Sequence, residues 1–359
     1  LSPNNYGYDL YGNETDSGDF LTKPRHPQVG AVYIQDRYEI TDLVVNAGIR
    51  FDYYNADQWE PKDYTNPGLD IEELEFDKSR FKKVDPFQTV SPRLGFAFPV
   101  TDRTKLHMQW GKFVQLPVLS RAYQGSYTRA TVLAGGYFYT NPVGWKLHPE
   151  RTTQYEIGFA HQFSMNASFD VTLFYKDIKD QLQVRRIFTA PEAGLRPYDI
   201  CQNGDFATTK GLEFHYTMRR TNRVMGWINY TFSQAKGTGS YYNQASASLD
   251  QATNQITIIT PLAFNQTHQG SISFDYRFGK DDGGPILERS GLNLLFRFNS
   301  GHPYTLSTGG MGQNDVSCGA TLPDQDARNR RPLEPIGAST TPWNFYLDAK
   351  LDKTVSITG

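Results

Sequence analysis

The 359-residue sequence lacks the long apolar runs, cysteine pairs and charge excess that mark several common protein classes. No run approaches the roughly 18–20 apolar residues of a membrane-spanning helix, which excludes helical membrane proteins. Two cysteines cannot build a disulfide scaffold, and no CxxC pair indicates a zinc site. With 36 basic and 38 acidic residues and a formal net charge of −2, the chain also lacks the basic excess of a nucleic-acid binder.

Catalytic motifs are missing as well. The sequence contains no HExxH helix, no nucleophile elbow and no Walker loop, so we predict neither an enzyme nor a resident metal or cofactor. The one acidic run suggests a calcium site in a loop, because calcium favours clustered carboxylate oxygens; it consists of Asp70, Glu72, Glu73, Glu75 and Asp77. Four basic residues follow between positions 78 and 83, and this favours the alternative of solvated, mutually neutralised charge.

What the sequence has in quantity is aromatic residues, 14% of the chain, arranged with a period of two. In segment 168–176, Phe169, Val171, Leu173 and Tyr175 fall on one face, and the intervening residues are mostly polar. Successive side chains of a strand point to opposite faces, so this is a strand with one apolar side. The same alternation marks segments 43–53, 94–100, 106–110, 155–163, 212–218, 228–232, 272–278, 292–298 and 345–351, and more weakly 31–40.

Strand and connection lengths narrow the fold class. We count about eleven strands, most of 8–15 residues; globular strands average about 5–6 residues, whereas a tilted membrane strand needs about 9–11. Short turns at Thr41–Asp42, Thr101–Thr104, Ser164–Ala167 and Thr221–Arg223 alternate with long connections near 57–86, 118–151, 185–206, 239–265 and 306–340; segment 279–291 is an exception. This sorting favours an all-β, transmembrane antiparallel β-barrel over a soluble sandwich.

A barrel in a membrane turns its apolar face to lipid and its charged face to a hydrated lumen. We therefore expect strands across residues 31–355 and an extracellular loop across 1–30. Six charged residues are predicted to face the lumen: Arg50, Arg93, Lys112, Glu156, Glu213 and Arg297.

Several motifs resemble those of the TonB-dependent outer-membrane transporters. The run SPRLGFAFPVTD at 91–102, followed by KLHMQWGKF at 105–113, is similar to paired barrel strands of that family. PERTTQYEIGF at 149–159 resembles its strand-opening signature, and YKDIKDQL at 175–182 and TKGLEF at 209–214 resemble the strands that follow. The segment WNFYLDAKLDKT at 343–354 is most similar to the Oar-like and SusC-like branches.

The resemblance implies a barrel of about twenty-two strands with an N-terminal plug domain and a TonB box. The chain shows about half of those strands, so we expect a partial barrel whose plug is absent from this chain. The family resemblance also implies that the predicted lumen-facing charges contact the plug or line the water around it. Turns would be periplasmic and long loops extracellular, in the bacterial outer membrane.

Active transport of a substrate across the outer membrane is the function that the resemblance implies. The TonB–ExbB–ExbD complex would act on the missing plug, and the surroundings would be outer-membrane lipid and lipopolysaccharide. The Oar-like similarity favours a large ligand such as a peptide, protein or glycan. The main alternative is a structural or docking barrel subunit of a larger outer-membrane complex, with a surface lipoprotein or another outer-membrane protein as partner. A passive porin and a soluble binding module are less favoured.

Aromatic residues in the predicted long loops are candidates for substrate capture, because rings offer amphipathic contact area. They are Tyr123, Tyr127, Tyr137, Phe138, Tyr139, Trp145, Tyr241 and Tyr242. The alternative for each is packing within the loops or a place in the aromatic girdle at the membrane boundary. Cys201 and Cys318 both fall in predicted extracellular loops, where a disulfide could join them in an oxidising compartment. The alternatives are two unpaired thiols, or a partner in the missing portion of the protein.

Overall fold

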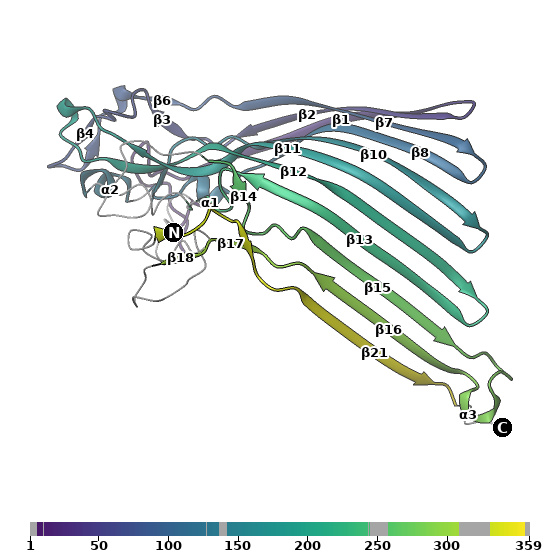
Figure 1. The fold of residues 1–359 in the computed structure, drawn as a ribbon. Helices are drawn as coiled ribbons and strands as arrows, with labels where there is room; N and C mark the ends of the chain where they lie inside the picture. The colour runs from purple at the N-terminus through teal and green to yellow at the C-terminus, as the bar shows by residue number, and fades with distance from the viewer. Residues whose placement is uncertain are drawn as a thin grey trace.

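The computed structural model describes residues 6–9, 11–126, 128–135, 142–242, 244, 258–308 and 331–355. Its main feature is one large sheet in which each long strand pairs antiparallel with its neighbours in the chain (Figure 1). In order these strands are β1 (Gln28–Ile40), β2 (Leu43–Asn55), β7 (Phe87–Thr101), β8 (Thr104–Gln115), β10 (Glu150–Ser164), β11 (Ala167–Ile187), β12 (Tyr198–Thr221), β13 (Val224–Gly237), β15 (His268–Arg277), β16 (Ser290–Asn299) and β21 (Asn344–Lys353). The all-β, antiparallel prediction is confirmed.

Smaller elements lie outside this path. Two short strands extend the sheet, β9 (Val143–Gly144) beside β12 and β14 (Thr260–Pro261) beside β13. The remaining short strands are β3 (Trp59–Pro61), β4 (Leu69–Asp70), β5 (Glu75–Phe76), β6 (Phe81–Lys83), β17 (Pro303–Tyr304), β18 (Ser307–Thr308), β19 (Arg331–Pro332) and β20 (Ser339–Thr340), and the α-helices are α1 (Leu119–Ala122), α2 (Arg129–Gly135) and α3 (Gly284–Leu287). None of the helices in the described ranges is long and apolar enough to span a membrane.

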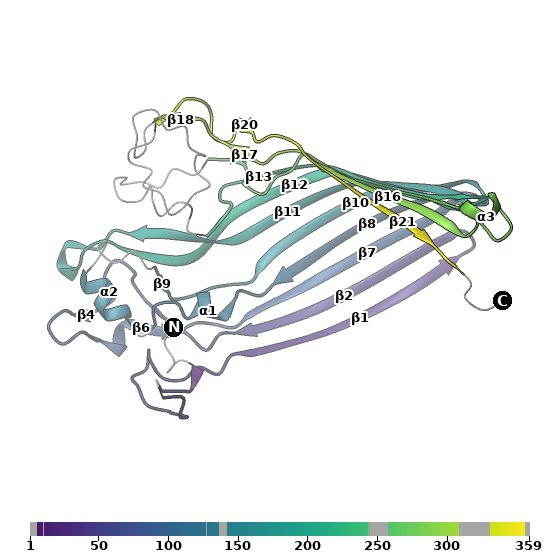
Figure 2. The same ribbon diagram turned by 90° about the horizontal axis from the view of Figure 1, so that it is seen from below.

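The connections are sorted by end, as predicted. The tight turns gather at one end of the sheet together with α3, and the helices α1 and α2 lie beyond the other end with the loop segments (Figures 1 and 2). Thr41 and Asn222 sit in two of these turns with φ of 49° and 55°, a left-handed conformation that asparagine tolerates and threonine adopts less readily.

One predicted loop is mostly strand. Segment 185–206 was expected to be a long connection, but β11 continues to Ile187 and β12 already begins at Tyr198. Pairing persists beyond a bulge between Ile178 and Gln181, where Asp180 has a φ of 62°. The loop prediction is therefore wrong over most of its length, because the charged and amide side chains of this stretch conceal the alternation that marks a strand.

The sheet has two chemically distinct faces. Ile157 pairs with Met108 on one side and Leu173 on the other, and Ile157 and Leu173 are 45% and 51% exposed. The adjacent Glu156 lies on the opposite face, in line with Gln109. When partners are followed from strand to strand, five of the predicted lumen-facing residues share the face of Glu156: they are Arg50, Arg93, Glu156, Glu213 and Arg297.

Lys112 is the exception, and its assignment to the polar face is wrong. The register pairs it with Thr153, which shares the apolar face with Ile157. Lys112 also follows Trp110 by two positions, so both side chains point to the same side of β8. The prediction followed the charge of the residue rather than its position in the alternation.

The loop segments form a hydrophobic core of their own beyond the end of the sheet. Its most buried members include Leu133, Trp145 and Tyr198. Phe81 packs against Trp145 with ring centroids 5.5 Å apart. The guanidinium carbon of Arg129 lies over the Trp145 ring, 4.2 Å from its centroid. Arg129 donates from Nη2 to the Gly144 carbonyl at 2.7 Å, and burial lowers the pKa of its guanidinium. The loop segments therefore pack against one another around a shared core.

We expect Leu133→Ala to loosen this loop core while leaving the sheet intact. Removing a fully buried leucine side chain costs about 2–5 kcal/mol, through lost transfer energy and the cavity that remains. Limited proteolysis of the full-length protein should cut the loops faster, with the long strands still protected. Val118→Ala, an exposed position nearby, serves as the control, and equal cleavage rates in the two variants would contradict the packing described.

A second prediction tests the two faces. In a background with both cysteines replaced by alanine, spin labels at Glu156→Cys and Ile157→Cys should differ sharply in reconstituted full-length protein. The label at position 156 should be relaxed by a water-soluble nickel complex, and the label at 157 by lipid-dissolved oxygen, because adjacent strand residues face opposite sides. Glu213→Cys and Phe214→Cys should repeat the pattern, and an inverted result would reverse the assignment of the faces.

Candidate functional site

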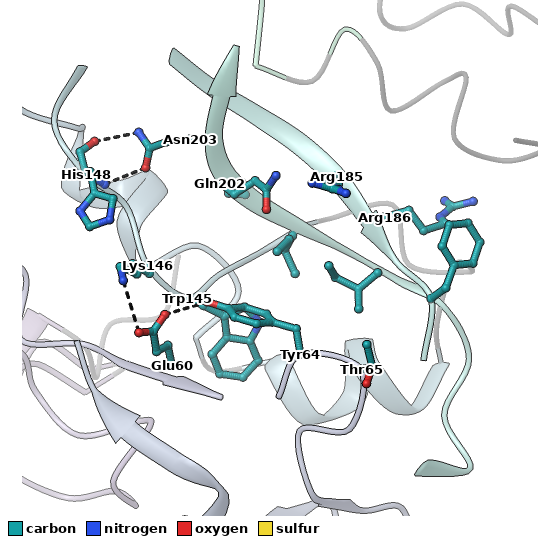
Figure 3. Close-up of a pocket in the computed structure, with 14 residues that line it drawn as sticks. Glu60, Tyr64, Thr65, Trp145, Lys146, His148, Arg185, Arg186, Gln202 and Asn203 are labelled. Atoms are coloured by element: carbon teal, nitrogen blue, oxygen red, sulfur yellow. Dashed lines mark hydrogen bonds and ion pairs between the residues drawn. The ribbon is translucent and has the colours of Figure 1, made fainter. Parts of the chain in front are cut away.

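A cavity of about 570 Å³ lies at the loop end of the structure, beneath the extended part of the β11–β12 hairpin (Figure 3). Arg185 and Gln202 come from the two strands of this hairpin, and Tyr64 and Trp145 come from the loop segments on the opposite side. Such a volume is within the usual range of small-ligand sites. We therefore treat this cavity as the candidate functional site.

The register of the hairpin holds one wall of the cavity in place. Arg185 pairs with Ile200 and Gln183 with Gln202, so the cavity residues belong to a continued ladder rather than to a free loop. Asn203 fixes the adjoining loop segment: its Nδ2 donates to the carbonyls of His148 and Asp180, at 2.8 and 2.7 Å. The backbone N–H of His148 donates in return to Asn203 Oδ1 at 2.7 Å.

The carboxylate in the cavity wall is already neutralised. Glu60 Oε1 forms ion pairs with the Nζ atoms of Lys82 at 3.3 Å and Lys146 at 3.4 Å, and Tyr64 Oη donates a hydrogen bond to Glu60 Oε2 at 3.0 Å. Burial, followed by the charge of Glu60, raises the pKa of Tyr64, so this hydroxyl remains a donor at neutral pH. Glu60 therefore contributes little negative field to the cavity.

The guanidinium groups are used unequally. Arg186 forms a buried fork with Asp199, from Nε to Oδ1 at 2.9 Å and from Nη2 to Oδ2 at 3.2 Å. Its neighbour Arg185 is exposed, and among the described residues it forms no ion pair. Burial, with a smaller contribution from Lys146, lowers the pKa of His148, so that imidazole is neutral near pH 7. The cavity is thus net positive, and Arg185 is its available cation.

The aromatic residues predicted as a capture surface fall into different places. Trp145 lines the cavity but is only 1% exposed and belongs to the loop core. Tyr123 is buried, donates from Oη to the Ala56 carbonyl at 2.8 Å, and has a pKa raised by burial. Tyr242 stacks against Arg121, whose guanidinium carbon lies 4.2 Å from the ring centroid, whereas Tyr241 is exposed. The remaining candidates lie outside the described residues: Tyr127, Tyr137, Phe138 and Tyr139.

The structure therefore brings one of these predicted aromatics to the cavity and adds residues that sequence reasoning missed. Arg185, Tyr64, Lys146 and Glu60 were not predicted as site residues. The adjacent arginines at 185 and 186 are the sequence feature that could have indicated the site. Neighbouring residues of a strand point to opposite sides, so one acidic partner cannot pair with both guanidinium groups, and the second one can bind a ligand.

Cys201 lies in a second, small hydrophobic cluster with Ala122 and Val184. Among the described residues it forms no disulfide; its surface is 1% exposed, and burial raises the pKa of its thiol to about 12. Its proposed partner Cys318 lies outside the described residues, so the disulfide stays a prediction.

The acidic run supports turns. Asp70 Oδ1 accepts from the backbone N–H groups of Glu72 and Glu73 at 2.9 and 3.2 Å, and Asp77 Oδ1 accepts from Ser79 N at 2.9 Å. Within the described ranges, no group of three or more acidic, histidine or cysteine side chains is placed to hold a metal ion.

Some charged side chains on the polar face of the sheet interact with other side chains of the same face. Arg50 Nε donates to Asp52 at 2.8 Å, Arg297 Nη2 donates to Asp348 at 2.8 Å, and the Arg93 guanidinium lies 4.5 Å from the Phe113 ring. These wall contacts leave the predicted contact of this face with a plug untested.

Comparison with known proteins agrees with this architecture. A family model described as "TonB dependent receptor-like, beta-barrel" matches residues 2–358. The search of curated proteins found no match.

Three solved structures share the fold. The chain is similar to the FrpB iron transporter from Neisseria meningitidis (F3-3 variant), with 13% identity, a TM-score of 0.53, and coverage of 91% of this chain and 38% of that one. The ferric-catecholate import receptor Fiu from K12 E. coli in its closed form is 16% identical, with a TM-score of 0.50 and coverage of 92% of this chain and 39% of that one. The outer membrane transporter YddB from Escherichia coli is 10% identical, with a TM-score of 0.52 and coverage of 90% of this chain and 47% of that one.

The chain spans less than half the length of each of these structures. At such low identity they show the fold alone, whereas the family model covers nearly every residue. The family and these structures are receptors and transporters, not enzymes, as predicted. The chain belongs to the family of TonB-dependent receptor-like β-barrels.

Proposed function

We propose that this chain forms part of the barrel of an active transporter in the bacterial outer membrane. The supporting observation is the family match across residues 2–358, together with a sheet whose one face is apolar and exposed. Transport would be energised by the TonB–ExbB–ExbD complex acting on a plug, with the turn end of the sheet periplasmic and the loop end extracellular. The charged face, with Arg50, Arg93, Glu156, Glu213 and Arg297, would meet the plug or its water.

Substrate capture would begin at the loop-end cavity, and the observation that carries this step is the available guanidinium of Arg185. Gln202 adds an amide beside it, and Tyr64 and Trp145 supply aromatic walls. A planar guanidinium recognises carboxylate and phosphate groups with two parallel hydrogen bonds. We therefore propose an acidic substrate.

The size of the ligand follows from a separate argument. The similarity of segment 343–354 to Oar-like and SusC-like proteins favours a peptide, protein or glycan. A cavity of about 570 Å³ would accept an acidic side group or chain end of such a ligand rather than the whole. Two of the structurally similar proteins are named for iron or ferric-catecholate uptake, but at 13% and 16% identity their substrates do not carry over.

A docking subunit of a larger outer-membrane assembly is the second candidate. The packed loop core around Leu133 and Trp145 favours it, because a preformed surface loses little conformational entropy when a partner binds. The two functions separate in cells: deletion of TonB should abolish substrate uptake by a transporter while surface binding persists. A docking subunit would accumulate no substrate in either strain.

We expect Arg185→Gln in the full-length protein to weaken binding of acidic ligands about 10- to 100-fold, the usual worth of a hydrogen-bonded charge pair. The measurement is calorimetric titration with acidic peptides and glycans, beside their amidated or neutral counterparts. Arg103→Gln, an exposed arginine in the turn at the other end, should leave affinity unchanged. Equal binding of neutral and acidic ligands by the unaltered protein would refute the assignment of the substrate class.

A further inference from the structure

An acidic side chain, that of Asp36, lies on the apolar, outward face at membrane depth. On β2 the outward residues are apolar or aromatic from Leu43 to Tyr53, a stretch of eleven positions, which matches the about 9–11 residues of a membrane-crossing strand. Asp36 pairs directly with Ala47, four positions beyond Leu43, and it lies four positions before the end of β1 at Ile40. Its carboxylate therefore lies inside the hydrocarbon layer of the proposed membrane, away from both boundaries.

Asp36 has no counterion nearby. The outward residues two positions away on β1 are Ile34 and Tyr38, and their partners on β2, diagonal to Asp36, are Ile49 and Val45. In the part of the chain that the structure describes, the carboxylate of Asp36 forms no ion pair or hydrogen bond. An unpaired carboxylate is unfavourable in hydrocarbon, so a residue of this kind indicates a partner group that reaches it from elsewhere.

Some other charges of the long strands are paired within their own strand. Asp177 also lies on the outward face, and it forms an ion pair at 3.3 Å with Lys179, two positions along β11. On the inward face of β1, Arg37 pairs with Glu39, again two positions away. Asp36 cannot use this arrangement, because uncharged side chains occupy the equivalent positions on both sides of it. Its cation must therefore come from outside β1 and β2.

The outer edge of β1 is the place from which such a cation would reach Asp36 most directly. β1 is the first strand in the order of the sheet, and among the described residues it pairs with β2 alone (Figure 1). Backbone groups along an edge must be paired in hydrocarbon, so in a complete barrel a further strand runs beside β1. The residue of that strand directly opposite Asp36 would have its Cβ atom about 4.5–5.5 Å from the Cβ atom of Asp36, a separation at which opposite charges pair.

We propose that the strand beside the outer edge of β1 carries a lysine or arginine directly opposite Asp36, and that this ion pair fixes the register in which the barrel closes. The inference rests on the proposed function, in which the chain forms part of a barrel. A shift of that strand by one residue turns the basic side chain to the lumen, and a shift by two moves it to a diagonal position, farther from the carboxylate. The first shift leaves Asp36 unpaired in hydrocarbon and the second weakens the pair, so the correct register is favoured over both.

The first test replaces Asp36 in the full-length protein and measures folding into lipid vesicles against urea, with the gel mobility of the unheated barrel as the readout. Asp36→Asn should lower the folding equilibrium constant roughly 100- to 1,000-fold, because removal of one partner leaves the other charge unpaired. Asp36→Glu should keep most of the stability. The matched control is Asp177→Asn, whose partner Lys179 is exposed, and it should change the constant less than about tenfold. Equal folding of the Asp36→Asn variant and the unaltered protein overturns the proposal, since an uncharged Asp36 needs no cation.

The second test identifies the basic residue. Photo-reactive p-benzoylphenylalanine in place of Tyr38 leaves Asp36 intact and labels the groups beside β1 in whole cells. The adduct should lie within the same polypeptide, on a strand with a lysine or arginine at membrane depth. Asp36→Lys should then prevent folding, and reversal of that basic residue to aspartate in the same protein should restore it. An adduct with a separate protein or with lipid alone overturns the proposal, and so does a double reversal that fails to restore folding.

Failure of this proposal and failure of the proposed function give different results. If the full-length protein is absent from the outer membrane, or if it lacks the mobility shift of a folded barrel, both are contradicted. If it folds there and shows the Arg185-dependent binding of acidic ligands, unchanged folding of the Asp36→Asn variant contradicts the ion pair alone. Loss of folding in that variant, with rescue by the paired charge reversal, supports the role of Asp36 in fixing the register.

Discussion

The continuous antiparallel ladder is the constraint on which the rest of the structure depends. Backbone N–H and C=O groups that face hydrocarbon must be paired within the protein, so the strands cannot break at membrane depth. An unbroken ladder fixes the side of every residue from its position alone, and Glu156 and Ile157 illustrate the result. Two environments of opposite polarity are thus separated by the thickness of a single sheet.

The same ladder builds the candidate site once it leaves the membrane. β11 and β12 pair over 21- and 24-residue strands, far more than a bilayer needs, and their upper part becomes the wall that carries Arg185 and Gln202. Loop segments pack against this wall because they bury Trp145, Leu133 and Tyr198 together. Extension of the hairpin therefore carries rigid strands beyond the membrane, where they set the position of one guanidinium in the proposed substrate cavity.

How far the sequence predicts this arrangement depends on which signal each residue carries. Strands such as β10 and the tight turns were predictable, because alternation with a strict period survives in the printed order of residues. The stretch 185–206 was not, since the consecutive residues Tyr198, Asp199, Ile200 and Cys201 are all buried, and a strand covered on both faces shows no alternation of exposed and buried positions. Burial in a loop core also leaves no pattern in the sequence. Trp145 and Tyr123 are predicted as exposed loop aromatics, but segments distant in the chain cover them in the fold.

Lys112 shows why position should outweigh residue type on a barrel wall. A charge in a membrane strand suggests the lumen, but the alternation that places Trp110 outward places Lys112 outward too. An outward lysine is unfavourable in hydrocarbon and favourable among headgroups, where its flexible stem lies along apolar surface and its ammonium group reaches phosphate. Lys112 lies eight residues after the start of β8, close to the length at which a tilted strand leaves the hydrocarbon layer, so a residue that contradicts the simple two-face rule is accommodated near the end of the membrane-crossing part of its strand.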